Sequence, residues 1–467
     1  MTVDAPETGQ HAASPSTWLW FEQALLEGGW AQSVRLGIHN GLIETLQTGV
    51  AAEPGDHVHA TGLPGLSNLH SHAFQRGMAG LAEVRGPSRD SFWTWRETMY
   101  RFVDRLRPDE VAAIAALAFA EMLEGGFTRV AEFHYLHHDI DGRPYDNVAE
   151  MAEAVASAAA ETGIGLTLLP VFYAHSAFGG AAPAEAQRRF VNALDGFERL
   201  LDASGRVASA LPDAVVGIAP HSLRAATREE LAVVCAMTNG PVHIHIAEQV
   251  REVEDCLAWS GARPVDLLFD TVAVDRRWCL VHATHMSSSE TRRLATSGAV
   301  AGLCPITEAN LGDGTFPAAD YLAASGAWGV GSDSNVLIDA AQELRMLEYS
   351  QRLAERSRNV MADPVGGSTG GAMFRATLVG GAQAAGTSGR GLAVGEVADI
   401  VALVSPEASD AVVGDRRLDH WIFAARDRQV AAVWRRGEQV VKDGRHIARS
   451  DITRRYARAL TRVLDDA

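Results

Sequence analysis

Lysine is almost missing from this sequence. Of the 41 lysine and arginine residues among 467 positions, Lys442 is the one lysine and all the others are arginine. Three kinds of site need a lysine: the phosphate loop of many nucleotide-binding proteins, an internal Schiff base, and a carbamylated lysine that bridges two metal ions. The sequence therefore excludes all three before residue 442.

Cysteine is scarce as well, and the few cysteines lie far apart in the sequence. The chain has four, none in a Cys-x-x-Cys pair: Cys235, Cys256, Cys279 and Cys304. This pattern argues against a thiolate zinc site and against a disulfide-rich secreted scaffold. Free thiols in a reducing compartment are the expectation.

Long apolar runs are absent too. The longest, Val111 to Leu123, is too short to span a bilayer. The first residues, Met1 to Ser16, include Asp4 and Glu7 and have no apolar core, so no signal peptide is predicted. We expect a soluble cytoplasmic protein.

The charge balance is acidic. With 58 aspartate and glutamate residues the formal net charge is −17, and 47% of the residues are hydrophobic. That composition is typical of a globular protein with a sizeable core. An acidic surface argues against nucleic acid and anionic membranes as partners, but it leaves a small anionic molecule open.

Both ends of the chain have a β-pattern. Val34 to Ile38 and Leu42 to Leu46 alternate on either side of an Asn-Gly turn, which favours a hairpin. Short strands with glycine turns return near the C-terminus. We therefore predict a small β-sandwich domain built from residues 1–62 and 391–467, with a second domain at 63–390 inserted between its halves.

Residues 63–390 have a different pattern, in which short apolar runs alternate with helical stretches. We count eight runs: Leu66–His72, Thr128–His134, Leu166–Tyr173, Val215–His221, Val242–Glu248, Trp278–His282, Val300–Pro305 and Gly329–Asp333. Continuous apolar strands that alternate with helices indicate a parallel sheet covered on both faces, and eight of them fit an α/β fold of the (β/α)8 TIM-like barrel type. A doubly wound open sheet is the alternative, although no Gly-x-Gly-x-x-Gly follows the first strand.

Several of these runs end in metal-binding residue types. His70 and His72 close the first run and share one strand face, so both imidazoles can bind one ion. A His-x-His pair alone is weak evidence. Four further run ends strengthen it: His221; His243, His245 and Glu248; His282; and Asp333. Because the carboxyl ends of barrel strands meet in one cup, these residues predict a metal site with an acid or base beside it.

With this pattern the chain resembles the amidohydrolase superfamily. The resemblance covers almost the whole sequence: His-x-His on strand one, His-x-x-Glu on strand five, His on strand six and Asp on strand eight. Some members carry a bridging carbamylated lysine on strand four. Here that place is taken by His221, which implies the branch that binds a single metal ion.

Longer strings resemble the formimidoylglutamate deiminases within that superfamily. They are NLHSHAFQRGMAGLAE (68–83), DSFWTWRETMYRF (90–102), AEFHYLHHD (131–139), APHSLRA (219–225), HIHIAEQ (243–249) and CPITEANLGDG (304–314). The resemblance implies hydrolysis of N-formimino-L-glutamate to N-formyl-L-glutamate and ammonia in histidine degradation, by a homodimer that uses one divalent metal ion, Zn²⁺ by ligand type.

The resemblance also implies a role for individual residues. The implied metal ligands are His70, His72, His245 and Asp333. The implied catalytic residues are Glu248, His282 and Asp333, and the implied substrate-binding residues are Gln75, Arg96, Tyr135, His221 and Arg224. His243 and His245 share a strand face, but His245 lies nearer the end of the strand. The aromatic residues Phe92, Trp93 and Trp95 are expected to serve packing more than recognition, and no ligand is assigned to them.

Two other readings of the same residues stay open. A nucleobase or amidine deaminase would have the same metal and proton-transfer residues, but a neutral heterocycle does not need the arginines. A catalytically silent metal-binding barrel would need neither Glu248 nor His282.

Overall fold

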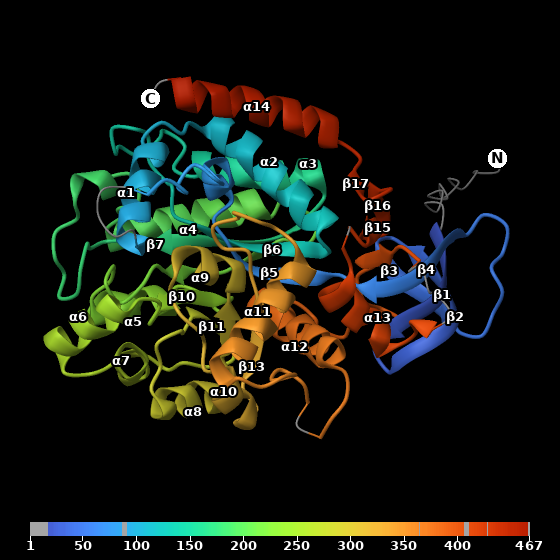
Figure 1. Ribbon diagram of the computed structural model, residues 1–467. Coiled ribbons are helices and arrows are strands. Elements are labelled where there is room, and N and C mark those ends of the chain that lie inside the picture. The colour runs from blue at the N-terminus through green and yellow to red at the C-terminus, as the bar shows by residue number, and fades with distance from the viewer. Residues whose placement is uncertain (1–16, 86–90, 364, 406–410, 427, 466–467) are drawn as a thin grey trace, which may run out of the picture.

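The computed structural model describes residues 17–85, 91–363, 365–405, 411–426 and 428–465. The segment that carries the signal-peptide expectation, residues 1–16, lies outside the described residues. The described elements form a barrel with a β-sheet unit at one end (Figure 1). Of the helices described, none is both long and apolar enough to cross a membrane.

Parallel strands follow one another around the barrel. They are β5 (Leu66–Ser71), β6 (Phe127–His134), β7 (Gly165–Phe172), β8 (Val215–Val216), β9 (Ala219–Pro220), β10 (Val242–Ile246), β11 (Trp278–His282), β12 (Val300–Leu303) and β13 (Ala327–Val330). β8 and β9 both pair with β7 and together make the fourth strand. Parallel bridges Ile218–Val242 and Ser71–Asp333 join the two ladders of strands into a ring. Each predicted run overlaps one of these strands, so the predicted barrel is confirmed.

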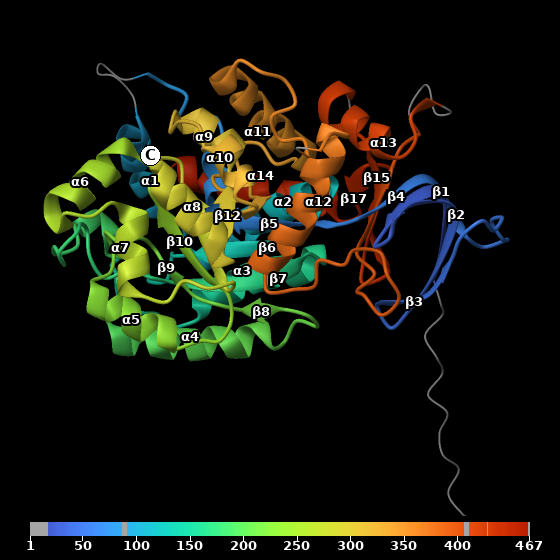
Figure 2. The ribbon, with the colours of Figure 1, turned by 90° about the horizontal axis from the view of Figure 1, so that it is seen from below.

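Helices cover the outside of the barrel. They are α2 (Pro108–Glu124), α3 (Glu150–Thr162), α4 (Leu194–Ala208), α5 (Arg228–Ala236), α6 (Val250–Ser260), α7 (Pro264–Thr271), α8 (Ser288–Ser297), α10 (Ala318–Ala323), α11 (Ala340–Glu355) and α12 (Thr369–Ala384). Three further helical segments follow the carboxyl ends of strands: η1 (Ala73–Met78) and α1 (Phe92–Val103) after β5, and α9 (Pro305–Leu311) after β12. Both α1 and α6 lie at the end of the barrel away from the terminal sheet (Figure 2).

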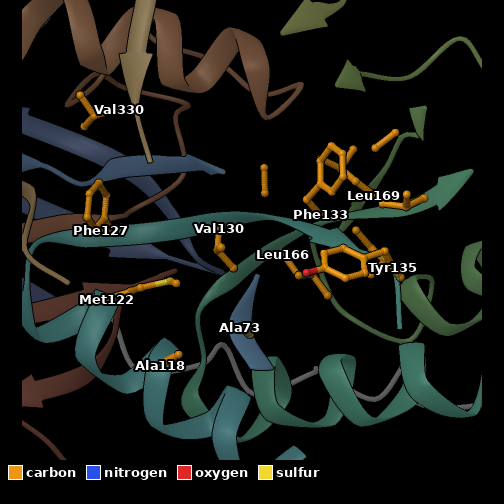
Figure 3. Close-up of a cluster of buried hydrophobic side chains, with 14 of the residues drawn as sticks. Ala73, Ala118, Met122, Phe127, Val130, Phe133, Tyr135, Leu166, Leu169 and Val330 are labelled. Carbon is orange, nitrogen blue, oxygen red and sulfur yellow. The ribbon is translucent and has the colours of Figure 1, made fainter. Parts of the chain in front are cut away.

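The barrel strands are apolar on both faces because both faces are covered. β6 is buried along its whole length. In Figure 3, Val130 of β6 points towards Ala118 and Met122 of α2, while Phe133 points to the opposite side of the strand. The outer residues thus pack against helices, and the inner ones fill the barrel below the predicted site.

The terminal strands form one mixed sheet of eight strands in the order β17-β16-β15-β14-β4-β1-β2-β3. The N-terminal half contributes β1 (Thr17–Leu26), β2 (Gly29–His39), β3 (Leu42–Gln47) and β4 (His57–Pro64); the C-terminal half contributes β14 (Ile400–Leu403), β15 (Val430–Arg435), β16 (Glu438–Lys442) and β17 (Arg445–His446). The predicted hairpin joins β2 to β3, and Asn40 and Gly41 supply the left-handed turn at φ 50° and 81°.

The two halves of this sheet enclose a core of their own. Phe21 and Leu36 from the N-terminal strands pack with Ile400 and Trp434 from the C-terminal strands, all of them buried. This shared core holds the two chain ends together, as the predicted sandwich required, although the strands belong to one continuous hydrogen-bonded sheet.

The last helix, α14 (Arg449–Asp465), lies along α2 and not on the sheet (Figure 1). Arg449 forms ion pairs with Glu121 and Glu124 of α2 at 2.8 and 2.9 Å, and Ile452 and Val463 are buried in the barrel's core. The predicted domain division at residues 62/63 and 390/391 stays a prediction. The structure adds that the final helix packs on the barrel.

Candidate metal and catalytic site

Four residues from three strand ends converge inside the barrel. The candidate ligand atoms of His70, His72, His245 and Asp333 all lie within 4.8 Å of one another, and all four residues are buried. Asp333 Oδ1 is 3.4 Å from Nε2 of both His70 and His72, and His70 Nε2 is 3.0 Å from His245 Nε2. The structure thus brings together the four residues implied as metal ligands.

The hydrogen bonds of two imidazoles fix which ring nitrogen faces the centre. His72 Nδ1 lies 3.0 Å from the Phe133 carbonyl, and His245 Nδ1 lies 3.1 Å from the His221 carbonyl. Since a carbonyl can only accept, both Nδ1 atoms donate and both Nε2 atoms keep a lone pair. His243 lies two residues earlier on the same strand, and its Nε2 instead bonds the Ala384 carbonyl at 2.8 Å.

The protonation states suit a divalent ion. Burial lowers the pKa of His70 to about 3 and lowers the pKa values of His72 and His245. Burial works against the charged form of Asp333, but the hydrogen bond and charge of His70, with His282 and His72, outweigh it and hold the pKa of Asp333 below its usual range. Three neutral imidazoles and one carboxylate are a donor set that zinc accepts. The residues present fit the metal that the sequence predicts.

The backbone around the site is unusual. Ala247, His282, Ala283, Asp333 and Asn335 all adopt positive φ, between 44° and 68°. Non-glycine residues rarely adopt this conformation, and where they do, the surrounding structure must hold it. These residues sit where β10, β11 and β13 end, so the chain turns sharply there and directs its side chains into the cup.

One asparagine supports the turn at Asp333. Asn335 Nδ2 donates to Ser71 Oγ, the His72 carbonyl and the Asp333 carbonyl at 3.0 to 3.1 Å, and its Oδ1 accepts from Ser332 Oγ at 2.6 Å. These bonds tie the end of β13 to the end of β5. The His-x-His segment and Asp333 are therefore held as one unit.

The implied proton-transfer residues lie beside this centre. His282 Nε2 is 3.9 Å from Glu248 Oε1 and 3.8 Å from Asp333 Oδ2. Burial raises the pKa of Glu248 to about 7. Burial opposes the charged form of His282, but Glu248, Glu308 and Asp333 outweigh it and raise the pKa of His282 above its ordinary value. A carboxyl group whose pKa lies near neutrality can both accept and give a proton at pH 7.

A cavity opens over the centre. Its wall includes the five residues implied in substrate binding, Gln75, Arg96, Tyr135, His221 and Arg224, together with Glu248, His282 and Asp333. His70 is not part of this wall, because it lies beneath. The structure therefore gathers every predicted site residue either on the cavity wall or directly below it.

Some polar atoms in this cavity are free to bind a ligand. Gln75 Nε2 donates to the Tyr135 hydroxyl at 2.8 Å, but Gln75 Oε1 is buried and has no partner among the described residues. The buried Arg224 Nε likewise has no partner in the part of the chain that the structure describes. Burial and the charge of Arg224 hold the pKa of His221 well below its ordinary value, so that ring is neutral at pH 7. The cavity thus offers the Arg224 guanidinium to an anion and an amide acceptor at Gln75, with no acidic residue among the five.

The segment with the aromatic residues Phe92, Trp93 and Trp95, which are expected to serve packing, borders the cavity. Phe92 and Trp95 line the cavity, and three guanidinium groups lie around the Trp93 ring: Arg96 at 4.6 Å, Arg251 at 4.9 Å and Arg224 at 5.9 Å from its centroid. This contact could not be predicted from the sequence, because it depends on α1 lying near α6 and near the turn that carries Arg224. Cation–π contact with the Trp93 ring attracts these guanidinium groups to one side of the cavity.

Fold and site together define a metal-dependent hydrolase of the barrel type. The chain belongs to the amidohydrolase family, which it matches over residues 61–440. Residues 17–60 match the formimidoylglutamate deiminase HutF N-terminal domain. The family resemblance predicted from the motifs is therefore confirmed.

Several relatives are similar along most of the chain. A formimidoylglutamate deiminase of Pseudomonas aeruginosa is 49% identical over 96% of this chain and 99% of its own. An 8-oxoguanine deaminase of the same species is 30% identical over 62% of this chain and 64% of its own. A crystal structure of an amidohydrolase from Brucella melitensis superimposes with a TM-score of 0.93 and 54% identity, covering 96% of this chain and all of that one.

Proposed function

We propose that this protein hydrolyses N-formimino-L-glutamate to N-formyl-L-glutamate and ammonia, a step in histidine degradation. The observation that carries the proposal is the likeness of almost the full chain to a formimidoylglutamate deiminase at 49% identity. The site agrees with it chemically. A candidate metal centre, a buried carboxyl group and two arginines meet in one cavity, which suits an amidine substrate that carries carboxylates.

One divalent metal ion, which we propose is Zn²⁺, would be held by His70, His72, His245 and Asp333. When bound, such an ion lowers the pKa of a water molecule to about 7 and polarises the substrate. The protein's part is to keep the three imidazoles neutral and correctly turned. The carbonyls of Phe133 and His221 fix the orientation of the His72 and His245 rings, and burial keeps both rings neutral.

The proton transfers fall to the residues beside the centre. Water adds to the formimino carbon, and its proton is taken up by His282 or Asp333, which lie 3.8 Å apart. Glu248 carries a proton to the departing nitrogen, so that ammonia leaves and the carbonyl of the formyl product forms. With a pKa near 7, Glu248 can cycle between its two states during turnover.

The substrate's carboxylates would be bound by Arg96 and Arg224, with Gln75, Tyr135 and His221 as neutral hydrogen-bonding partners. Arginine forks suit carboxylates because two parallel N–H groups match two oxygens. The buried Nε of Arg224, which has no hydrogen-bond partner among the described residues, supports this assignment, since buried polar atoms are normally satisfied.

Other parts of the proposal concern the whole protein. We propose a cytoplasmic homodimer that acts on a small dicarboxylate and binds neither nucleic acid nor membrane. The net charge of −17 supports the last two points, because both partners carry negative charge.

Ammonia release from the purified, metal-replete protein tests the proposal. N-formimino-L-glutamate should be a substrate, whereas guanine, adenine and cytosine should not. Release from a nucleobase but not from the formimino compound would contradict the proposal in favour of a nucleobase deaminase. Release from none of them by a metal-loaded protein would favour a silent metal-binding barrel.

A further inference from the structure

A buried glutamate outside the predicted site contacts the catalytic histidine from behind. Glu308 Oε1 lies 3.2 Å from His282 Nδ1, and the two side chains are 7% and 1% exposed. His282 thus has a carboxylate on each side: Glu308 at Nδ1, and Glu248 with Asp333 at Nε2. Glu308 is not among the metal-binding, catalytic or substrate-binding residues that the sequence predicts.

The position of Glu308 is set by the first turn of α9. Its Oε1 also accepts the backbone N–H of Cys304 at 2.9 Å, and its own N–H donates to the Cys304 carbonyl at 2.9 Å. Thr307, the preceding residue, bonds Ser334 Oγ at 2.9 Å. The carboxylate is therefore pinned to the backbone on one side and anchored beside the end of β13 on the other.

This contact decides the state of the histidine ring. A carboxylate next to Nδ1 accepts the proton of that nitrogen, so in neutral His282 the lone pair is on Nε2. Nε2 is the atom that faces Glu248 and Asp333 and can take a proton from water. Without an acceptor at Nδ1, the other tautomer and a rotated ring become accessible, and neither presents a base to the cavity.

We propose that Glu308 is a positioning residue for the proposed reaction: it holds His282 by the Nδ1 proton so that Nε2 faces the reacting atoms. The inference rests on the proposed function, since it assigns Glu308 to the proton transfers of that same site. It adds a carboxylate–histidine pair to the site that acts through His282 and does not touch substrate.

The alternative is that Glu308 merely caps α9, and the chain supplies a matched control for it. Glu343 of α11 is likewise a fully buried carboxyl group that accepts a backbone N–H of the same turn, Ile306 N–H at 3.0 Å. No described hydrogen bond or ion pair connects Glu343 to His282. A purely structural role should make the two residues equivalent.

The test compares steady-state ammonia release from N-formimino-L-glutamate among variants with equal metal content and melting behaviour. Glu308→Ala should lower kcat about 10–100-fold, the usual cost of losing an orienting partner, and leave KM unchanged. Glu308→Asp moves the carboxylate away from His282 by the length of one methylene group, so its kcat should be lowered as in Glu308→Ala. Glu308→Gln keeps an acceptor at Nδ1 and should recover most of the activity, and Glu343→Gln should be close to wild type.

A double-mutant cycle completes the test. In the His282→Asn background, Glu308→Ala should have no further effect on kcat, because the residue acts only through that ring. Additive losses, equal losses in the Glu308 and Glu343 variants, a Glu308→Gln protein as slow as Glu308→Ala, or wild-type kcat in Glu308→Ala and Glu308→Asp would each overturn the inference. An inactive wild-type protein would instead contradict the proposed function.

Discussion

The Nε2 atoms of His70 and His245 lie 3.0 Å apart, although the two residues come from the first and the fifth strand of the barrel. Because His245 donates through Nδ1, its Nε2 directs a lone pair at the other ring. Two ring nitrogens at this distance, with the Asp333 carboxylate beside them, are better explained as ligands of one shared cation than as a hydrogen-bonded pair.

The two histidines of β10 give a direct test of that centre. His245→Ala should reduce the bound metal to substoichiometric levels, because one of four ligands is lost. His243→Ala should keep its metal, since His243 Nε2 bonds the Ala384 carbonyl and faces no ligand atom. Metal analysis of dialysed protein measures both. Equal loss of metal in the two variants would mean that removing any histidine side chain from β10 disturbs the site, and that His245 is not specifically a ligand.

Glu248 is the second point to test. Glu248→Gln should keep the metal and the fold, because the side chain keeps its size, while kcat falls by about 10²–10⁴, as for the loss of a general acid or base. Steady-state ammonia release together with metal analysis measures this. A variant with near-normal kcat would remove Glu248 from the proton transfers and leave His282 and Asp333 to perform them.

The arginines of the cavity should act on substrate affinity. Arg224→Met should raise KM for N-formimino-L-glutamate about 10–100-fold, which is the worth of a charge-assisted hydrogen bond, and should leave kcat/KM for formamidine unchanged. Arg228→Met is the matched control: this exposed arginine lies over Trp259, outside the cavity wall, and its loss should change neither substrate. An unchanged KM in Arg224→Met would exclude it from carboxylate binding.

Much of this site could be predicted from sequence because of how a parallel barrel is built. Each strand is a short apolar run, and the residue at its carboxyl end points into the common cup. The positions of His70, His72, His282 and Asp333 at the ends of apolar runs are therefore sufficient to predict that these residues lie near one another. The eight runs overlap the observed strands for the same reason.

What could not be predicted depends on contacts between distant segments. Glu308 meets His282 only because α9 folds back over the end of β11, and Arg251 reaches Trp93 only because α6 and α1 lie at one end of the barrel. The placement of α14 on α2 is of the same kind, since its arginines find their partners on a helix more than 300 residues earlier. No local pattern carries that information.

The single lysine allows a further prediction. Lys442 ends β16 in the terminal sheet and is exposed, away from the ligand cluster. Lys442→Met therefore gives a lysine-free protein that should keep full ammonia release and full metal content. Loss of metal in this variant, with the fold intact by circular dichroism, would contradict a centre made only of histidine and aspartate.

Asp213 is one of the residues that link the terminal sheet to the barrel, and its contribution can be tested by its effect on stability. Asp213 Oδ2 pairs with Arg129 of β6 at 2.5 Å and with Arg435 of β15, and both arginines are buried. Asp213→Asn removes the carboxylate that pairs with Arg129, while Arg435 keeps its ion pair with Asp399 at 2.7 Å, and should cost about 1.5–3 kcal/mol. At pH 7 the melting temperature should fall clearly below that of wild type.

The pH dependence of that difference follows from the pKa of Asp213. Burial alone would raise it, but Arg435 and Arg129 outweigh burial and hold the pKa below its usual range. A lowered pKa in the folded state means that the stabilisation is complete above the unfolded pKa of about 3.9 and is lost as the pH falls through the folded value. The gap in melting temperature between wild type and Asp213→Asn should thus stay constant from neutral pH downwards and narrow only in strong acid.

Asp195→Asn, which breaks an exposed pair with Arg199, should show no gap at any pH. A gap that widens in acid would mean that Asp213 is protonated in the folded protein and does not hold the two units together by its charge.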